Sequence, residues 1–547
     1  MWFPKDGINC LIGPGDSGKT TILDAIDLCL GARRNVQFLD SDFFKGDTSS
    51  PVQIEITIGD LDDELKNIDS YGMYLRGFDN VAEQIVDEPA VKLETVMTVQ
   101  LVVDEDLEPT WHLISDRALL HGQMRSLAWA DRMKLSPARL GTFSSFDLSW
   151  RKGSVLTKIS AEKVDTSLAM VKVNREARQA FGQEANEQLK GARSVVSETA
   201  VTLGVSVGKD VHAMLDMASM SVSGGIISLH DEIGIPLSNL GVGSKRLLIA
   251  GLQRKAGEQA SVLIIDELEY GLEPHRLIRL LGSLGAKEKE SPMQVFVTTH
   301  SPVAVRELNG SQLFLLRKAE NSHEVNSVGV ENDIQGTVRA YPDALLASSV
   351  LVCEGATEIG FLRGLDLYRV SNGLQSMMAS GVALADGGGI TKVFKRATAF
   401  QQLKGRIAVL RDDDVKPDAK DEALFKATGD VFSWSKDFAI EDEIFHSLSI
   451  DGVERLIQKA VIFWGDEFVD ANIRTASNGK LSLKDCKSDV LKDQRGVLAK
   501  AAKLGKGWFK RIDLMEEVAR DVIGPDKADA AFVARVEAIF NWVKDGY

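Results

Sequence analysis

The amino-acid sequence predicts an α/β protein built from two successive units. Three observations support this fold class. A glycine-rich loop follows a short apolar strand near the N-terminus, later apolar strands end directly on acidic or histidine residues, and a second series of such strands begins after residue 345. Alternating strands and helices of this kind are typical of parallel sheets covered by helices. We expect the first unit to span residues 1–335 and the second to span residues 345–547, ending in a helical region.

The composition is that of an ordinary globular chain. Of its 547 residues, 44% are hydrophobic and 26% are charged. The sequence has no apolar run of about 18 residues and no signal-peptide pattern, so we expect no membrane association. The four cysteines lie far apart without a CxxC pair, which argues against a zinc site or disulfide framework and fits the cytoplasm. These cysteines are Cys10, Cys29, Cys353 and Cys486.

Residues 8–30, INCLIGPGDSGKTTILDAIDLCL, predict a phosphate-binding loop between a buried strand and a helix. The loop satisfies GxxxxGK[ST], in which glycines let backbone N–H groups converge on phosphate oxygens at a helix N-terminus. Lys19 is expected to reach the β- and γ-phosphates, and Thr20 is expected to bind Mg²⁺. The candidate ATP-binding residues of this loop are Gly13, Gly15, Ser17, Gly18, Lys19, Thr20 and Thr21.

Two later strands end on residues that such a site needs. An apolar strand over residues 261–265 is followed by Asp266, expected to hold Mg²⁺ through water, and by Glu267, expected to polarise the attacking water. The strand over residues 295–298 leads to His300, which is placed to contact the γ-phosphate.

A second glycine-rich helix start precedes the Asp266 strand. It contains Ser238, Gly241 and Gly243 in PLSNLGVGSKRLLIAGL and has no phosphate of its own within one subunit. The segment makes sense if it caps the γ-phosphate bound to another subunit, which predicts a homodimer or a higher homo-oligomer.

The residues between these motifs predict a β-layer and a helical insertion. Residues 52–61 alternate like a half-buried strand, and residues 91–116 read as two strands around an acidic turn. From about residue 158 to 210 the sequence is helical but lacks sustained heptads. This insertion fits a dimerisation element and an intramolecular helical cap equally well.

In the second unit, two strands end on carboxylates. Glu354 follows the strand over residues 350–353 and Glu358 opens the next helix, while Asp412 and Asp414 follow the strand over residues 407–410. Because neighbouring parallel strands end at the same sheet edge, these side chains are expected to converge. Clustered carboxylates repel one another unless a cation lies between them, and oxygen-only ligands favour Mg²⁺ or Mn²⁺. Two such ions can support phosphodiester cleavage by water.

The motif order of the first unit resembles the ABC-type ATPase head of the SMC/RecF/Rad50 group. That resemblance implies a P-loop ATPase head with an antiparallel β-layer and a helical insertion, which dimerises around ATP. The sequence departs from the group in three respects. It has LSNLGVGSK where LSGGQ is usual, it lacks the usual asparagine in GPGDSGKT, and we expect its N-terminal hairpin to be short or absent.

The second unit resembles the Toprim fold, whose signature is a strand-end glutamate followed by DxD. ADGGGITKVF, residues 385–394, looks like the glycine turn between the two acidic motifs, and DFAIEDEIF resembles the motif that adds a further metal ligand. Glu441 is the first choice for that ligand and Glu443 is the alternative. An ABC-type head followed by Toprim is similar to the OLD (overcoming lysogenization defect) family, which includes the nuclease subunit of Gabija antiphage systems. The resemblance covers nearly the whole chain.

This resemblance implies a DNA endonuclease that uses divalent metal, with ATP acting on the head as a regulator, in antiphage defence or DNA repair. A helicase-like partner protein is possible in such systems. The net charge is −15, yet residues 487–511 hold eight basic and two acidic residues and predict a local DNA-binding surface. The resemblance also implies a lysine beside the metals, for which Lys510 and Lys506 both qualify.

Two other functions fit parts of the pattern. One is a RecF/SMC-like ATPase for DNA repair whose Toprim unit binds nucleic acid without cutting it. The other is a topoisomerase or primase, which we rank last because a topoisomerase needs a nucleophilic tyrosine in a cleavage domain. None of the six tyrosines lies in a recognisable winged-helix context; they are Tyr71, Tyr74, Tyr270, Tyr341, Tyr368 and Tyr547.

Overall fold

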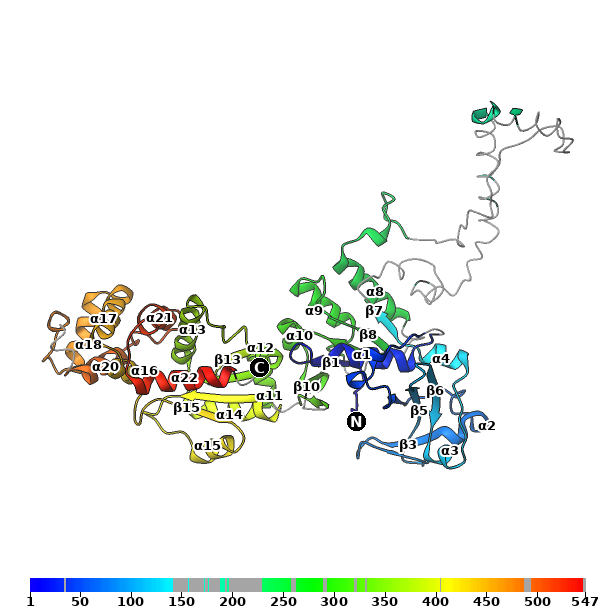
Figure 1. The fold of residues 1–547 in the computed structure, drawn as a ribbon, viewed down its shortest axis with the longest axis horizontal. Coiled ribbons are helices and arrows are strands. Elements are labelled where there is room, and N and C mark those ends of the chain that lie inside the picture. The colour runs from blue at the N-terminus through cyan, green and yellow to red at the C-terminus, as the bar shows by residue number, and fades with distance from the viewer. Residues whose placement is uncertain are drawn as a thin grey trace. The chain divides into compact units, whose positions relative to one another are not determined.

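The computed structural model shows two compact units, one formed by residues 1–139 and 262–547 and the other by residues 140–261 (Figure 1). The structure describes residues 1–33, 36–140, 229–256, 262–288, 293–318, 322–329, 332–403, 405–486 and 493–544, together with residues 156, 172, 176, 187–191 and 194–195. Most of the predicted helical insertion at about 158–210 therefore lies outside the described residues.

A six-stranded sheet carries the phosphate loop. Its order is β11-β10-β1-β9-β8-β7, and β1 pairs in parallel with β9 and β10, while β11 is antiparallel to β10. The strands are β1 (Ile8–Ile12), β7 (Ala138–Leu140), β8 (Val262–Ile265), β9 (Gln294–Thr298), β10 (Leu313–Lys318) and β11 (His323–Ser327). The helices named with this sheet are α1 (Lys19–Leu30), α9 (Pro274–Ser283) and α10 (Pro302–Glu307). Leu11, Leu23 and Phe296 pack in one core, so the fully buried strand β1 fixes the start of α1.

The predicted antiparallel β-layer is present. The long strand β5 pairs with β2, β3 and β6, and β4 extends the sheet beyond β3. These strands are β2 (Val52–Ile58), β3 (Leu75–Asp79), β4 (Gln84–Val86), β5 (Glu94–Val103) and β6 (Pro109–Ile114). Short helices α2 (Ile68–Tyr71), α3 (Asp116–Leu120) and α4 (Trp129–Leu135) accompany them. Cys29, at the end of α1, belongs to the hydrophobic core of this layer and ties the phosphate-loop helix to it.

The unit of residues 140–261 is described mainly by its C-terminal part. A short 3-10 turn, Leu237–Asn239, leads into helix α8 (Val242–Ala256). The helix predicted after the second glycine-rich segment is thus present.

A four-stranded parallel sheet organises the C-terminal part, in the order β13-β12-β14-β15. Its strands are β12 (Ser349–Cys353), β13 (Val382–Asp386), β14 (Arg406–Arg411) and β15 (Asp430–Ser433). Side chains alternate along β12, so that Val350 and Val352 pack in one core and Leu351 and Cys353 in the other. Both faces are covered by helices, including α11 (Asn332–Ala340), α12 (Pro342–Leu346), α13 (Ala356–Ser371), α14 (Ile390–Gln402) and α15 (Ala419–Lys426).

Helices follow this sheet to the C-terminus, as the sequence predicts. They are α16 (Ile440–Ser447), α17 (Ile450–Trp464), α18 (Asp466–Ala476), α20 (Arg495–Lys503), α21 (Ile512–Val518) and α22 (Ala530–Lys544). Trp508 and Phe509, between α20 and α21, are completely buried in this core. Among the described residues, every helix is too short or too polar to cross a membrane.

Candidate functional site

The ends of β12 and β14 bring the predicted carboxylates together. The two strands are parallel neighbours with Cys353 opposite Leu410, so Glu354 and Asp412 leave the same sheet edge. The backbone N–H of Glu354 donates to the carbonyl of Leu410 at 2.8 Å, and the N–H of Asp412 donates to Oε2 of Glu354 at 3.0 Å. Strand register therefore creates the convergence predicted from the sequence.

Two helix starts add Glu358 and Glu441 to this edge. Glu358, in the first turn of α13, accepts a hydrogen bond from the N–H of Gly355 at 2.9 Å. The first N–H of α16, from Ile440, donates to Oδ1 of Asp412 at 3.0 Å, which places the neighbouring Glu441 beside the strand ends. Glu358 and Glu441 are each only 3% exposed. We call Glu354, Glu358, Asp412, Asp414 and Glu441 the acidic cluster.

Burial and mutual repulsion both act on the acidic cluster. Burial raises the pKa of Asp412 well above its usual value, and the charges of Glu358, Glu354, Glu441 and Asp414 raise it further. Burial also raises the pKa of Glu358, with additional repulsion from Glu441 and Glu354. The pKa values of Glu354 and Glu441 are raised for the same first reason. Carboxylates that repel one another in a buried site are a natural place for a bound cation.

The middle aspartate of the triplet points to other partners. Asp413 is hydrogen-bonded to Arg411 at 2.8 Å, to Lys416 and to the N–H of Asp437. Burial alone would raise its pKa, but these hydrogen bonds outweigh burial and lower it. Asp414 thus acts on Glu354 by its charge and Asp412 by its backbone N–H, whereas Asp413 stabilises the turn that presents them.

The structure separates the two candidate glutamates of α16. Glu443 accepts hydrogen bonds from Arg535 at 2.8 Å and from the N–H of Ser435 at 2.9 Å, so its carboxylate is fully engaged. Oε1 of Glu441 is buried and has no hydrogen-bond partner among the described residues. An orphaned carboxylate oxygen inside a protein needs a partner. Glu441, rather than Glu443, therefore has a carboxylate oxygen available to bind a metal ion.

Of the two candidate lysines, the structure brings Lys510 to the acidic cluster. The charge of Lys510 lowers the pKa of Glu441, against the larger raising effect of burial. The buried residues Trp508 and Phe509 anchor the chain just before it. Its aliphatic stem lies over Gly507, where a methyl group would come within 2.5 Å of Cγ of Lys510. Lys506 and Lys510 are both exposed, and it is Lys510 whose charge acts on Glu441.

A glycine turn closes the other side of Glu354. The N–H of Gly389 donates to the carbonyl of Glu354 at 2.9 Å, and the backbone N–H of Ile390, the first residue of α14, lowers the pKa of the Glu354 carboxylate. The stem of Lys392 and the guanidinium of Arg396 both lie within 4 Å of the place where a Gly388 side chain would begin. Positive side chains therefore flank the turn next to the acidic cluster.

The donor set of the acidic cluster fits a hard divalent cation, since every side-chain donor is a carboxylate oxygen. In the described ranges, however, no group of three or more His, Cys, Asp or Glu side chains is arranged to hold a metal ion. Oxygens of Glu354, Asp412 and Glu358 instead accept backbone N–H groups. These side chains would have to turn before they could bind one ion together.

The side chain of Lys19 is hydrogen-bonded within the phosphate loop. Nζ of Lys19 donates to the carbonyls of Pro14 at 2.6 Å and Gly13 at 3.2 Å, and to Oγ of Ser17 at 3.3 Å. Burial lowers the pKa of Lys19, while Asp16 and other nearby carboxylates oppose that effect. At Gly13, with φ of 144°, a methyl group would lie 2.4 Å from the carbonyl oxygen of Leu316, so this position requires glycine. Gly15 and Gly18 belong to the same loop, and Thr21 is exposed in the first turn of α1.

The predicted magnesium ligands of the nucleotide site are adjacent. Oγ1 of Thr20 donates to Oδ1 of Asp266 at 3.2 Å, and Oγ1 of Thr298 donates to the same oxygen at 2.5 Å. Glu267 has φ of 47°, an uncommon conformation for a non-glycine residue, and its exposed side chain follows β8. His300 follows the neighbouring strand β9 and is also exposed.

Sequence reasoning missed Glu269 and Thr298, which hydrogen-bond within this site. The signal was present, since Glu269 stands two residues after Glu267, but only the pairing of β8 with β9 shows its partners.

Ser238, Gly241 and Gly243 lie at the start of α8 in the unit of residues 140–261. Their contact with a nucleotide stays a prediction.

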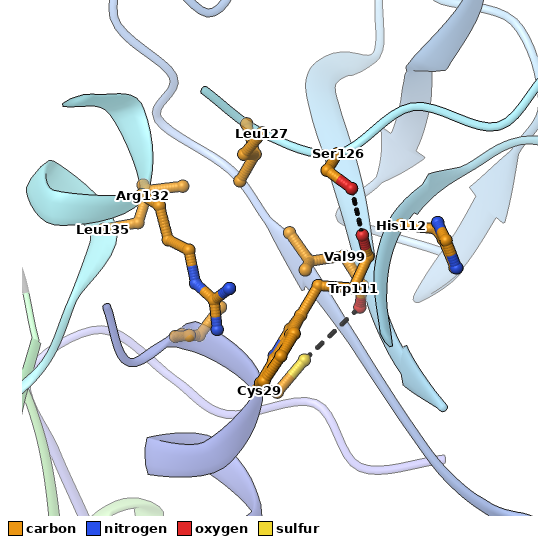
Figure 2. A pocket seen from close by; sticks show the side chains of 9 residues that line it. Cys29, Val99, Trp111, His112, Ser126, Leu127, Arg132 and Leu135 are labelled. Atoms are coloured by element: carbon orange, nitrogen blue, oxygen red, sulfur yellow. Dashed lines mark hydrogen bonds between the residues drawn. The ribbon is translucent and has the colours of Figure 1, made fainter. Parts of the chain in front are cut away.

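A pocket lies at the opposite end of α1 from the phosphate loop (Figure 2). The guanidinium of Arg132 stacks over the ring of Trp111 at 4.0 Å, and Trp111 donates to the carbonyl of Leu28 at 3.1 Å. The lining residues are Cys29, Leu30, Val99, Trp111, His112, Ser126, Leu127, Arg132 and Leu135. This pocket contains none of the predicted site residues.

Comparison with known proteins agrees with this organisation. Residues 8–306 match the family model described as AAA domain, putative AbiEii toxin, Type IV TA system. An OLD nuclease from Thermus scotoductus is 25% identical over 363 residues, which are 60% of this chain and 62% of that protein. The chain thus matches less than two thirds of the length of that relative.

Two solved structures show weaker likenesses. The Smc head domain from Pyrococcus furiosus, bound to the C-terminal domain of ScpA, is 14% identical with a TM-score of 0.33, covering 59% of this chain and 90% of that one. The C-terminal region of the Burkholderia pseudomallei OLD protein is 16% identical with a TM-score of 0.20, covering 36% of this chain and 98% of that one. At such TM-scores the likenesses carry no argument.

The family model spans more than half of the 547 residues and includes the phosphate loop, the Asp266 strand and His300. The similarity to an OLD nuclease extends over 60% of the chain and confirms the resemblance found in the motifs. The chain belongs to the family described as AAA domain, putative AbiEii toxin, Type IV TA system, and it is similar to an OLD nuclease.

Proposed function

We propose that this protein is an ATP-binding and ATP-hydrolysing DNA endonuclease that requires a divalent metal ion. The nucleotide site lies in the family-matched region, and the cutting site lies at the acidic cluster. The family description as a toxin and the similarity to an OLD nuclease support a role in antiphage defence or DNA repair.

The observation that carries the proposal is the acidic cluster itself. Glu354, Asp412 and Glu441 come from three separate elements and are largely buried. Burial raises the pKa of each carboxylate, the charges of Glu354 and Glu441 raise that of Asp412 further, and Oε1 of Glu441 has no partner among the described residues. Such an arrangement costs stability unless it serves a ligand, because charged groups lose hydration when they are buried. Strongly shifted pKa values are also typical of functional sites.

The chemistry follows from the donor set. Glu354, Glu358, Asp412, Asp414 and Glu441 would hold Mg²⁺, or Mn²⁺ in its place. A bound ion would lower the pKa of the attacking water and neutralise charge on the phosphate. In hydrolysis the water oxygen forms a bond to phosphorus, one ester P–O bond breaks, and the leaving oxygen takes up a proton. Lys510, whose charge acts on Glu441, would stabilise the added negative charge of the transition state.

ATP acts on the head as an assembly or regulatory signal in this proposal. Lys19 would leave the loop carbonyls and bind phosphate, while Thr20 and Asp266 would hold Mg²⁺. Ser238, Gly241 and Gly243 would complete the site of a second subunit. Mixing Lys19→Ala with Ser238→Arg subunits should then restore part of the ATPase activity. If no mixing ratio restores activity, the sites are not shared between subunits.

The proposal is tested with supercoiled plasmid DNA. The wild-type protein should nick or linearise the plasmid with Mg²⁺ or Mn²⁺, and chelator should stop the reaction. Glu354→Ala should abolish cleavage, while the exposed Glu467→Ala serves as a control that should cut normally. Cleavage that survives in purified Glu354→Ala protein would refute the assignment of the site.

One observation favours a second candidate function. In the described residues, no group of three or more carboxylates is arranged to hold a metal ion, which fits a DNA repair ATPase whose residues 345–547 bind DNA without cutting it. The plasmid assay separates the two functions. A non-cutting protein would still retain DNA in a binding assay, and Glu354→Ala would not weaken that binding.

A further inference from the structure

Glu269 occupies a central place in the nucleotide site. It follows β8 by a few residues and faces the turn after β9, the neighbouring parallel strand. Its carboxylate accepts two hydrogen bonds from that turn, one from Oγ1 of Thr299 to Oε2 at 2.6 Å and one from the N–H of His300 to Oε1 at 2.7 Å. One glutamate therefore holds the backbone on which His300 stands.

The turn is braced on both sides of His300. Thr299 is completely buried, and its Oγ1 also accepts the N–H of Ser301 at 3.0 Å, just before α10 begins. The imidazole of His300, by contrast, is exposed. The position of His300 depends on the hydrogen bonds of the turn. Glu269 accepts two of the three hydrogen bonds described above.

A parallel set of bonds holds the other reactive groups. The N–H of Glu267 donates to Oγ1 of Thr298 at 2.9 Å, and that hydroxyl donates to Asp266 at 2.5 Å. The N–H of Leu268 donates to the carbonyl of Thr298 at 2.9 Å. Hydrogen bonds thus join the segment 266–269 to the turn 298–301. They fix Asp266, Glu267 and His300 relative to one another.

We propose that Glu269 is a positioning residue for ATP hydrolysis, which keeps His300 in register with Asp266 and Glu267 through its bonds to Thr299 and His300. This inference rests on the proposed function, since it concerns the hydrolysis of ATP by the head. Glu269 does not take part in proton transfer. It acts only by fixing the turn, and a displacement of about 1 Å in a catalytic group can cost about 100-fold in rate.

Two substitutions at Glu269 distinguish positioning from chemistry. Glu269→Ala removes both bonds, so kcat for ATP hydrolysis should fall about 10- to 100-fold, while KM and the affinity for a fluorescent ATP analogue change less than about threefold. Glu269→Gln is isosteric, and its amide can accept the His300 N–H and donate to Thr299. It should retain most of kcat with an unchanged pH profile, whereas Glu267→Gln should abolish hydrolysis.

A mutant cycle tests the route through His300. If Glu269 acts by placing His300, adding His300→Ala to Glu269→Ala should cause little further loss, because the two changes remove the same contribution. The matched control is Glu307→Ala, which removes a glutamate paired with Lys287 at 2.9 Å on α10 and should leave kcat unchanged.

Each outcome decides between the alternatives. Wild-type kcat in Glu269→Ala, equal inactivity of Glu269→Gln and Glu269→Ala, or fully additive losses with His300→Ala would each overturn the inference while leaving the ATPase assignment intact. Absence of hydrolysis in the wild-type protein, despite ATP binding, would instead refute the ATPase part of the proposed function and the inference with it.

Discussion

Replacing Gly507 by alanine is the sharpest local test of the role given to Lys510. At Gly507, with φ of 70°, a methyl group would lie 2.5 Å from Cγ and 2.7 Å from Cδ of Lys510. The lysine stem must therefore move, and we expect this movement to change the position of its charge relative to Glu441. Positive φ adds a backbone cost of about 1–2 kcal/mol for a residue with a side chain.

Gly505 supplies a matched control for the backbone cost. It has φ of 61°, but a methyl group there would meet only Cζ of Phe468 at 4.0 Å, an ordinary contact. Gly505→Ala should lower the thermal stability about as much as Gly507→Ala and leave cleavage unchanged. Gly507→Ala should approach the loss of Lys510→Ala, about 100-fold or more for a group that stabilises transition-state charge.

The assay is the initial rate of plasmid nicking at saturating Mg²⁺, measured for the three variants together with their melting temperatures. Equal nicking rates in Gly507→Ala and Gly505→Ala would refute the reasoning, because the collision with Lys510 would then have no consequence. A rate loss in both variants in proportion to their instability would refute it as well.

Three further predictions follow from the same contacts. The pKa of Asp412 is raised above its ordinary value of 3.8, so the metal-free fold loses stability as pH rises above that value. Asp412→Asn should therefore raise the melting temperature more at pH 8 than at pH 5. An equal gain at both pH values would contradict the raised pKa of Asp412. Lys19→Ala should lose ATP hydrolysis but retain metal-dependent nicking, whereas loss of both activities in folded protein would mean that ATP drives the cutting. Lys392 lies beside the glycine turn, and Lys392→Glu should weaken DNA binding measured in the presence of chelator and reduce the salt dependence of binding by about one phosphate contact. Lys395 is exposed one turn further along α14, and Lys395→Glu should have a smaller effect on both quantities.

The parts of the fold that follow local rules were predictable from the sequence. The phosphate loop requires glycines at fixed spacing between a strand and a helix, and Gly13 indeed leaves no room for a side chain. Carboxylates at the ends of β12 and β14 had to meet once the strands were parallel neighbours. The antiparallel β-layer was visible because its strands alternate in hydrophobicity.

Choices that depend on distant residues were not predictable. Glu441 and Glu443 are equivalent in the sequence, and only Arg535, 92 positions away, shows that Glu443 is engaged. Lys506 and Lys510 both sit in the basic segment, but the course of the chain through buried Trp508 and Phe509 directs Lys510 to the acidic cluster. The role of Glu269 depends on the register of β8 against β9, which no single segment encodes.

Direct measurement of Mn²⁺ binding by calorimetry or electron paramagnetic resonance tests the central claim, that the acidic cluster holds divalent metal. In the absence of ATP, the wild-type protein should bind Mn²⁺ at this site, and Glu441→Gln should weaken the binding at least about tenfold because it alters the carboxylate whose oxygen has no protein partner. Glu467→Gln, an exposed change of the same kind on α18, should bind as the wild type does. Identical Mn²⁺ binding by all three proteins would contradict the account.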